Sequence, residues 1–252
     1  MATRHKNIVR LYDSFETQRH LVFVMELCAG GDLLTYVRRR GFLKEDVARE
    51  FFKQACAAVG YCHRKNIVHR DIKLDNMLLD IGPAGTSEVT LKLCDFGVSR
   101  LLADVDTDLM TEQCGTPAYI APEILLGCQG GTGYKGFTPD IWSLGVCLYA
   151  MLFGTVPFKA NNMQDLHAMI VKGKYTLKKK QELSRDLKQL LRGLLEPDPL
   201  KRMKMRDIVE HKWLSKGGKV QETPEIFSES ELEAIRKDFT YKEMIPQTRK
   251  QV

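Results

Sequence analysis

Two short segments of the sequence carry charged and oxygen-bearing side chains at a spacing that suits phosphate chemistry. The segment HRDIKLDN contains Asp71, Lys73 and Asn76, and the segment DFG begins with Asp95. Magnesium takes oxygen ligands such as carboxylates, usually together with phosphate oxygens. A lysine ammonium can neutralise a phosphate as a point charge. These residues predict magnesium-assisted chemistry on a phosphate group, and the alternative is a surface turn with solvated charges.

The elements expected to hold these segments are a few strands followed by helices. Runs rich in β-branched and aromatic residues predict strands at NIVRLYDSF, HLVFVMEL, NMLLD and VTLKLC. Apolar residues at helical spacing predict helices at 32–40, 44–65, 138–153, 162–171, 184–195 and 204–214. In the second of these helices, one stripe holds Val47, Phe51, Ala55, Val59 and Cys62. This order of elements indicates an α+β fold.

The bulk composition argues against several classes of protein. The chain has 252 residues, of which 44% are hydrophobic, enough for one large core or two modest lobes. A net charge of +6 without a sustained basic tract argues against nucleic-acid binding. The most apolar stretch, IWSLGVCLYAMLFG, is too short for an ordinary membrane span and predicts a buried helix. Seven cysteines without a C-x-x-C pair, and a polar N-terminus, predict free thiols in a reducing, cytoplasmic setting.

Five motifs together resemble those of eukaryotic protein kinases of the serine/threonine type: HRDIKLDN, DFG, GTPAYIAPE, DIWSLGVCLYAML and DPLKR. Their wording is most similar to the calcium/calmodulin-dependent kinase group. The resemblance implies an α+β kinase fold, with residues 1–27 as part of the small lobe and the start of the hinge, 28–214 as the large lobe and 215–252 as a tail. It also implies ATP and Mg2+ as cofactors and a protein as the substrate.

The resemblance implies a role for each of the charged residues in these motifs. Asp71 accepts the proton of the substrate hydroxyl, and Lys73 steadies the transferred phosphoryl group. Asn76 and Asp95 are the implied magnesium ligands. A further set is implied to build the scaffold: His69, Phe96 and Leu11 in a hydrophobic spine, Glu123 paired with Arg202, and Asp140 bonded to the backbone of the HRD loop.

The resemblance also places the adenine pocket and a substrate-binding surface. Met25 is implied to guard the back of the pocket, while Glu26 and Cys28 offer backbone groups to the adenine edge. A core methionine in a strand is compatible with the same position. Asp32 and Asp75 lie where kinases that prefer basic substrates place acids that bind arginine. For Asp32 the alternative is the N-cap of a helix that starts in GGDLL.

Substrate type and activation are implied by two further positions. Lys73 and Thr116, within DIKLDN and GTPAY, resemble serine/threonine kinases rather than tyrosine kinases. Many relatives carry a phosphorylatable threonine four residues before this threonine, and here that residue is Glu112, preceded by Thr111. We expect the Glu112 carboxylate to pair with Arg70 and to order the loop in place of a phosphate. The alternative is a solvated glutamate with no such role.

The stretch GTGYKG matches the spacing G-x-G-x-x-G of phosphate-binding loops. However, Gly131, Gly133 and Gly136 follow the APE motif, and neither a preceding strand nor a βαβ unit surrounds them. Kinases carry a variable surface loop at this place. We therefore interpret the three glycines as a flexible insertion that does not bind a nucleotide.

The residues before the predicted hinge raise the question of activity. No glycine-rich hairpin and no V-A-I-K strand precede Met25, so we expect the small lobe in this sequence to be incomplete and residues 1–252 alone to bind Mg-ATP weakly. Two strands alone are marginally stable, and their exposed apolar faces should make the chain sticky. An active serine/threonine kinase is the favoured interpretation, and the alternative is a non-catalytic pseudokinase that acts as a scaffold. The sequence leaves the oligomeric state open.

The tail contains one more helical pattern, in IFSESELEAIRKDF. Ser228 and Glu231 form a capping box, and Leu232, Ile235 and Phe239 form an apolar stripe. The pattern resembles the opening helix of a calcium-binding hand. The following TYKEMIPQT lacks the alternating acidic ligands and the glycine of such a loop, so no calcium site is expected. We predict that the helix docks on the large lobe or regulates it.

Overall fold

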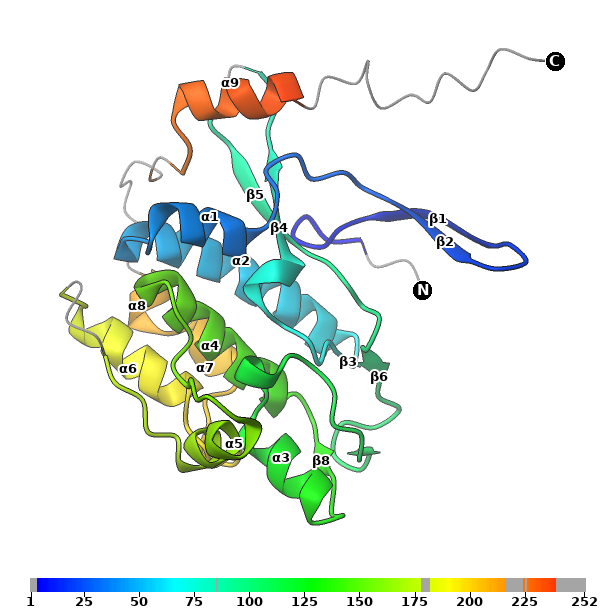
Figure 1. Cartoon of the computed structure of the whole chain (residues 1–252), viewed down its shortest axis with the longest axis vertical. Coiled ribbons are helices and arrows are strands. Elements are labelled where there is room, and N and C mark those ends of the chain that lie inside the picture. The colour runs from blue at the N-terminus through cyan, green and yellow to red at the C-terminus, as the bar shows by residue number, and fades with distance from the viewer. Residues whose placement is uncertain (1–3, 85, 178–181, 216–223, 225, 239–252) are drawn as a thin grey trace.

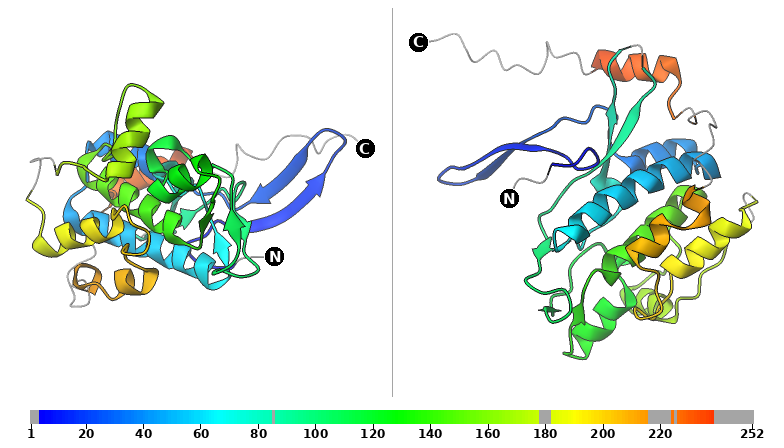
Figure 2. Two further views of the ribbon diagram at one scale, coloured as in Figure 1. Left: turned by 90° about the horizontal axis from the view of Figure 1, so that it is seen from below. Right: turned by 180° about the vertical axis from the view of Figure 1, so that it is seen from behind.

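A helical body carries a two-stranded hairpin on one side and a single helix at its upper end (Figures 1 and 2). This computed structural model describes residues 4–84, 86–177, 182–215, 224 and 226–238. In chain order its elements are β1 (Leu11–Glu16), β2 (Leu21–Met25), α1 (Leu33–Arg40), α2 (Glu45–Arg64), β3 (Ile67–Val68), the 3-10 turn η1 (Leu74–Asn76), β4 (Met77–Ile81), β5 (Val89–Leu93), β6 (Arg100–Leu101), β7 (Leu109–Met110), η2 (Pro117–Tyr119), α3 (Pro122–Gln129), β8 (Tyr134–Lys135), α4 (Thr138–Phe153), α5 (Met163–Lys172), α6 (Arg185–Leu194), α7 (Met205–Val209), α8 (Lys212–Ser215) and α9 (Glu229–Asp238).

Helix α4 forms the centre of the core. Every residue from Pro139 to Phe153 is buried except Ser143, as expected for a helix that is apolar on all sides. Helix α2 packs against α4 and against strand β5 with the stripe predicted from the sequence. Four of the five stripe residues are buried, and Val47, in the first turn, is half-buried. Each large apolar side chain buried here contributes about 1.5–3 kcal/mol to stability.

Helix α3 was not predicted. The boundaries of the first five predicted helices agree with the observed ones to within two residues. The helix expected at 204–214 is wrong, because the chain forms α7 and α8 as two separate helices. Ile208 and Trp213 are both fully buried. Their separation of five residues places them on different faces of one straight helix, since neighbours on a face are three or four residues apart. The break allows both side chains to enter the core.

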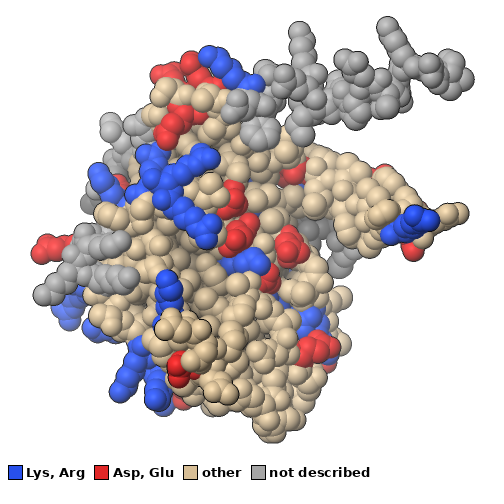
Figure 3. Space-filling view, viewed as in Figure 1, with Lys and Arg blue, Asp and Glu red and all other residues tan. Residues whose placement is uncertain are grey.

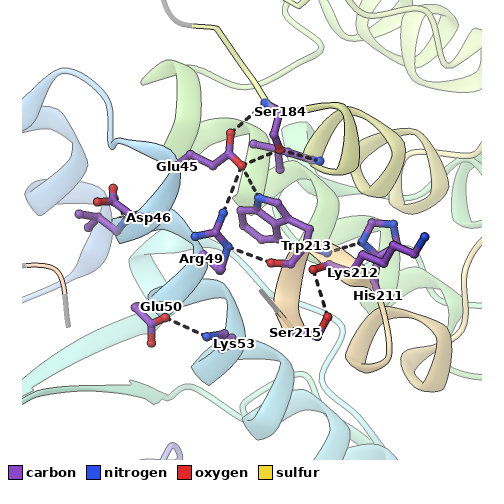
Figure 4. A network of polar contacts seen from close by, with 12 residues as sticks. Glu45, Asp46, Arg49, Glu50, Lys53, Ser184, His211, Lys212, Trp213 and Ser215 are labelled. Atoms are coloured by element: carbon purple, nitrogen blue, oxygen red, sulfur yellow. Dashed lines mark hydrogen bonds and ion pairs between the residues drawn. The ribbon is translucent and has the colours of Figure 1, made fainter. Parts of the chain in front are cut away.

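A polar network fixes the start of α2 to two later helices (Figure 4). The Glu45 carboxylate accepts hydrogen bonds from Ser184 N and Oγ, at 2.9 and 2.6 Å, and from Trp213 Nε1 at 2.7 Å. Arg49 joins the same network, bonding Glu45 and the Trp213 carbonyl. Burial opposes the charge on Glu45, but the hydrogen bonds from Ser184 and Trp213 outweigh it and lower the pKa of this carboxyl. The carboxylate thus stays charged and holds α2, α6 and α8 together.

The antiparallel pair β4–β5 brings the two chemically interesting segments to one end. Met77 at the start of β4 faces Leu93 at the end of β5. Asn76 directly precedes β4, and Asp95 follows β5 by two residues. Because antiparallel strands place the start of one beside the end of the other, Asn76 and Asp95 lie at the same end of the pair.

The hairpin β1–β2 projects from the body (Figure 1). Its large apolar side chains are exposed. Leu11 is 47% exposed and Met25 is 55% exposed. The predictions of Leu11 as a spine member and of Met25 as a core methionine are therefore wrong in this structure, since no other element of the described chain covers this hairpin. The first predicted strand also begins later than expected. Asn7 and Val9 instead bond the backbone of Leu93.

A second short pair, β7–β8, corrects the interpretation of GTGYKG as a flexible surface insertion. Leu109 pairs with Lys135 and Met110 pairs with Tyr134. The side chains of Met110 and Tyr134 are both buried. The glycine-rich stretch is thus joined to the segment that precedes Glu112.

The tail helix α9 docks on the large body beside α1 and the turn between β4 and β5, as Figures 1 and 2 show. The predicted capping box is present, because Ser228 N donates to the Glu231 carboxylate at 2.8 Å. Glu231 also pairs with Arg40 at 2.9 Å, and Arg236 donates to the carbonyl of Pro83 at 3.0 Å. Leu232 is buried at the contact, whereas Phe239 and TYKEMIPQT lie outside the described residues. Among the described helices, none is both long and apolar enough to cross a membrane.

Candidate active site

A buried aspartate binds the backbone of the loop that carries Asp71. Asp140 lies in the first turn of α4, and its carboxylate accepts hydrogen bonds from His69 N and Arg70 N, both at 2.9 Å. Its Oδ2 also lies 2.9 Å from His63 Nε2. Burial opposes the charge on Asp140, but the contact with His63 outweighs it, so the pKa of this carboxyl is lowered. The predicted bond from Asp140 to the HRD loop is confirmed, and the contact with His63 is new.

Two residues next to the site have a backbone conformation that non-glycine residues rarely adopt. Arg70 has φ of 69° and Asp95 has φ of 62°, both in the left-handed region. Such conformations cost about 1–3 kcal/mol each and persist only where surrounding contacts enforce them. The two strained residues flank the same site, Arg70 immediately before Asp71 and Asp95 at the start of DFG.

Asp71 is the hub of a compact cluster of polar side chains. Lys73 Nζ lies 2.8 Å from Asp71 Oδ2, and Asn76 Nδ2 donates to the same oxygen at 3.1 Å. Thr116 donates to Asp71 Oδ1 from both its backbone N, at 3.0 Å, and its hydroxyl, at 2.8 Å. Lys73 Nζ also donates to the Thr116 hydroxyl at 2.9 Å. The structure thus brings together four residues that the sequence places up to 45 positions apart.

These contacts set the charge states of the cluster. Burial disfavours the charge on Asp71, but hydrogen bonds from Lys73 and Thr116 outweigh it, and the pKa of Asp71 is lowered. Burial likewise disfavours the charge on Lys73, but the bond to Asp71 prevails and raises the pKa of the ammonium. Both groups are therefore charged at neutral pH. An ionised carboxylate beside an ammonium is an arrangement that can orient a hydroxyl and a phosphate together.

Asn76 and Asp95 both lie next to this cluster, Asn76 in contact with Asp71 and Asp95 near Lys73. Asn76 is buried at the end of η1, and the exposed Asp95 is close enough to Lys73 to add to the raising of its pKa. Behind Asp95, the rings of Phe96 and His69 meet edge to face at 4.9 Å. This contact confirms two of the three predicted spine residues. The predicted pair of Glu123 and Arg202 is also present, with Nη2 to Oε2 at 2.8 Å.

Near the cluster, the segment from 109 to 116 carries the residues predicted to regulate it. Arg70 Nη1 donates to Glu112 Oε2 at 2.9 Å. Glu112 is largely exposed, whereas the guanidinium of Arg70 is mostly covered. The hydrogen bond from Arg70 lowers the pKa of Glu112. Thr111 is exposed and its carbonyl accepts a hydrogen bond from Cys128. The predicted pairing of Glu112 with Arg70 is thus present, and the regulatory role remains a prediction.

The residues at and after the predicted hinge use their side chains for contacts within the protein. The side chain of Glu26 pairs with Lys92 at 2.8 Å and accepts a hydrogen bond from Arg10 N at 3.0 Å. Cys28 is buried, and burial raises the pKa of its thiol to about 12. Asp32 is the N-cap of α1 and accepts hydrogen bonds from Thr35 N and Oγ1. The N-cap interpretation is therefore confirmed, while a role for Asp32 in binding arginine remains untested.

The sequence analysis missed three contacts at and around the site. Thr116 was identified by its motif, but its contact with Asp71 was not expected. His63 and Lys92 carry no pattern that marks them as partners of Asp140 and Glu26. Long-range contacts of this kind leave no periodic signal in one sequence, because they depend on how distant elements meet.

Comparisons with known proteins identify the family of this chain. The profile of the family described as the protein kinase domain matches residues 1–214. The chain therefore belongs to the protein kinase family, and its curated relatives are of the serine/threonine type. It is 37% identical to CBL-interacting serine/threonine-protein kinase 20 of Arabidopsis thaliana, over 93% of this chain and 51% of the relative. It is 41% identical to serine/threonine protein kinase OSK3 of Oryza sativa subsp. indica, over 83% of this chain and 38% of the relative. The chain spans about half the length, or less, of the curated relatives it matches.

Proposed function

We propose that this protein transfers the γ-phosphoryl group of ATP to serine or threonine hydroxyls of protein substrates. The observation that carries the proposal is the cluster of Asp71, Lys73 and Thr116, in which a carboxylate, an ammonium and a hydroxyl lie within 2.9 Å of one another in pairs. Phosphoryl transfer needs little covalent chemistry from a protein, so positioning and neutralisation of charge dominate.

Asp71 is the proposed acceptor of the substrate hydroxyl proton. Its lowered pKa keeps it ionised, so it can accept a hydrogen bond from the substrate hydroxyl and orient that oxygen toward the phosphorus. Thr116 and Asn76 hold the carboxylate in place. Lys73 lies beside it and is placed to balance negative charge on the transferred group.

Asn76 and Asp95 are the proposed ligands of Mg2+. Both residues lie beside the same end of the β4–β5 pair. Within the described residues, no group of three or more His, Cys, Asp or Glu side chains could hold a metal ion. A pair of ligands fits magnesium, which is commonly held by one or two side chains plus phosphate oxygens. When bound, the ion neutralises charge on the phosphates.

A substrate with basic residues before the acceptor hydroxyl is the proposed preference. Asp75 is exposed in the same loop as Asp71. On the face shown in Figure 3, acidic side chains gather in the middle of the molecule, to the right of a group of basic ones. Acidic side chains of the protein attract basic residues of a substrate, and such charge complementarity guides substrate choice more than it adds affinity. Met25, Glu26 and Cys28 are proposed to contact the adenine. Of these residues, Cys28 is buried and Met25 is exposed.

We place the protein in a reducing compartment such as the cytoplasm. All seven cysteines lie in the described residues and are free. The alternative of a pseudokinase scaffold has no observation in its favour, because the four polar residues of the catalytic motifs are all present.

The test is a phosphoryl-transfer assay with Mg-ATP and serine and threonine peptides on the full-length protein, meaning this chain together with any segments encoded before or after it. Asp95→Asn should remove magnesium-dependent transfer, because an anionic ligand is replaced by a neutral one, and should leave the circular dichroism spectrum unchanged. Wild-type rates in this variant would contradict the assignment of Asp95. Absence of transfer in the wild type would contradict the proposed function.

A further inference from the structure

The loop that contains GTGYKG contacts four consecutive residues of the segment before the catalytic cluster. Leu109 and Met110 pair with Lys135 and Tyr134 as strands β7 and β8. At the next two residues the contacts come from the side chains of Cys128, at the end of α3, and of Tyr134. The thiol of Cys128 donates to the carbonyl of Thr111 at 3.1 Å. The hydroxyl of Tyr134 donates to the carbonyl of Glu112 at 3.2 Å.

Glu112 is therefore held from two directions. Arg70 binds its carboxylate, and Tyr134 binds its backbone carbonyl. The buried ring of Tyr134 and the buried side chain of Met110 anchor this contact in the protein interior. A contact from an exposed glutamate to an arginine is worth little alone, because the side chain is free to move and water screens the charge. Because Tyr134 fixes the backbone of Glu112, the glutamate has less freedom to move away from Arg70, and the contact contributes more to stability.

The glycines of the loop are required by its shape. Gly131, Gly133 and Gly136 have φ between 67° and 69°, in the left-handed region that favours glycine. A methyl group on Gly133 would lie 2.7 Å from the carbonyl oxygen of Met110 and 2.8 Å from the Leu109 side chain. On Gly127 it would overlap the carbonyl of Gly133. On Gly131 it would meet nothing within 4 Å.

We propose that the loop from Gly127 to Gly136 is a positioning clamp for residues 109–112, which keeps Glu112 against Arg70 when the segment carries no phosphate. The G-x-G-x-x-G spacing then reflects close packing of two backbones rather than binding of a nucleotide. Tyr134 is a positioning residue, since it acts on the catalytic cluster through Glu112 and Arg70. The effect on catalysis rests on the proposed kinase function, whereas the ordering of the segment does not.

The experiment is hydrogen exchange on the 252-residue chain, compared among wild type, Gly133→Ala and Gly131→Ala. The two variants introduce the same methyl group at the same φ, but only the first meets the backbone of the segment. We expect peptides that cover 105–116 to exchange roughly tenfold faster in Gly133→Ala and less than about twofold faster in Gly131→Ala. Peptides from α4 serve as the control for global unfolding. Equal exchange of 105–116 in wild type and Gly133→Ala would overturn the clamp.

A second variant covers the outcome in which Gly133→Ala does not fold. Tyr134→Phe keeps the buried ring and removes the hydroxyl, which binds the carbonyl of Glu112 and also contacts the side chains of Arg70 and Cys114. It should speed exchange near Glu112, and unchanged exchange there would contradict the role of Tyr134. Phosphoryl transfer by the unphosphorylated full-length protein is measured in parallel. Transfer without the contrast in exchange would reject the clamp alone, and the contrast without transfer would reject the proposed function alone.

Discussion

The Arg70 guanidinium donates a 2.9 Å hydrogen bond to the Glu112 carboxylate, and Arg70 is the residue immediately before Asp71. The same guanidinium donates from Nε to the carbonyl of Val98, three residues after Asp95. One side chain therefore links the segment that carries Glu112 to both charged motifs. A glutamate brings a single negative charge, whereas a phosphothreonine brings about 1.5 to 2 and three acceptor oxygens. This relationship supports a kinase whose loop is ordered without phosphate.

This relationship predicts different effects of two neighbouring substitutions. After phosphatase treatment of the full-length protein, Glu112→Ala should lower the rate of phosphoryl transfer by about 5–10-fold, because Arg70 loses its charge-assisted partner. Thr111→Ala should change the rate by less than about twofold, since the observed contact of Thr111 with the loop uses its carbonyl. If Thr111→Ala abolishes transfer while Glu112→Ala has no effect, Thr111 is the switch instead.

The pKa of Glu112 gives a prediction about pH. Its folded pKa is lowered by Arg70, so the charged pair is fully formed above the ordinary glutamate pKa of about 4.3 and is lost only as the pH falls through the lower folded value. The ratio of wild-type to Glu112→Gln transfer rates should therefore be the same at pH 6 and pH 8. A ratio that falls toward one at pH 6 would show that another ionisation controls this contact.

Asp140 is predicted to be essential for stability. Asp140→Asn keeps one acceptor oxygen but places an amide where the backbone N–H groups of His69 and Arg70 require acceptors. The free energy of unfolding should fall by about 3 kcal/mol in urea titration, because hydrogen bonds to a buried charge are lost. Glu210→Gln, in an exposed pair with Arg206, should cost less than about 0.5 kcal/mol. Equal costs for the two variants would contradict the anchoring role.

The exposed hairpin predicts self-association of the 252-residue chain. Leu21 and Phe23 lie on the same face of β2, and both are more than half exposed. Replacing both with lysine should lower the light scattering of concentrated solutions, because a contiguous apolar surface is interrupted. The control is Ser14→Lys with Gln18→Lys, which adds the same charge at polar positions of the hairpin. Similar scattering from both double variants would attribute the effect to net charge alone.

The sequence predicted those parts of the structure that depend on local pattern or on family motifs. Helix α4 was predicted with its observed ends, since its apolar run is long and begins beside a proline. The contacts of Asp140 and Arg202 followed from the resemblance. Strands β7 and β8 were not predicted, because two-residue strands are too short to show a period. Exposed apolar faces were expected on the first two strands, yet Met25 was interpreted as a core residue. This interpretation failed because the burial of a side chain depends on which elements cover its strand.

The central claim is that Asp71 acts on the substrate hydroxyl, and single-turnover transfer from Mg-ATP to a serine peptide tests it most directly. Asp71→Asn preserves the size of the side chain and removes the carboxylate charge. In the full-length protein the rate should fall by about 100-fold or more, while the affinity for Mg-ATP changes less than about threefold. The account would be contradicted by a variant that binds Mg-ATP normally and transfers phosphate at the wild-type rate.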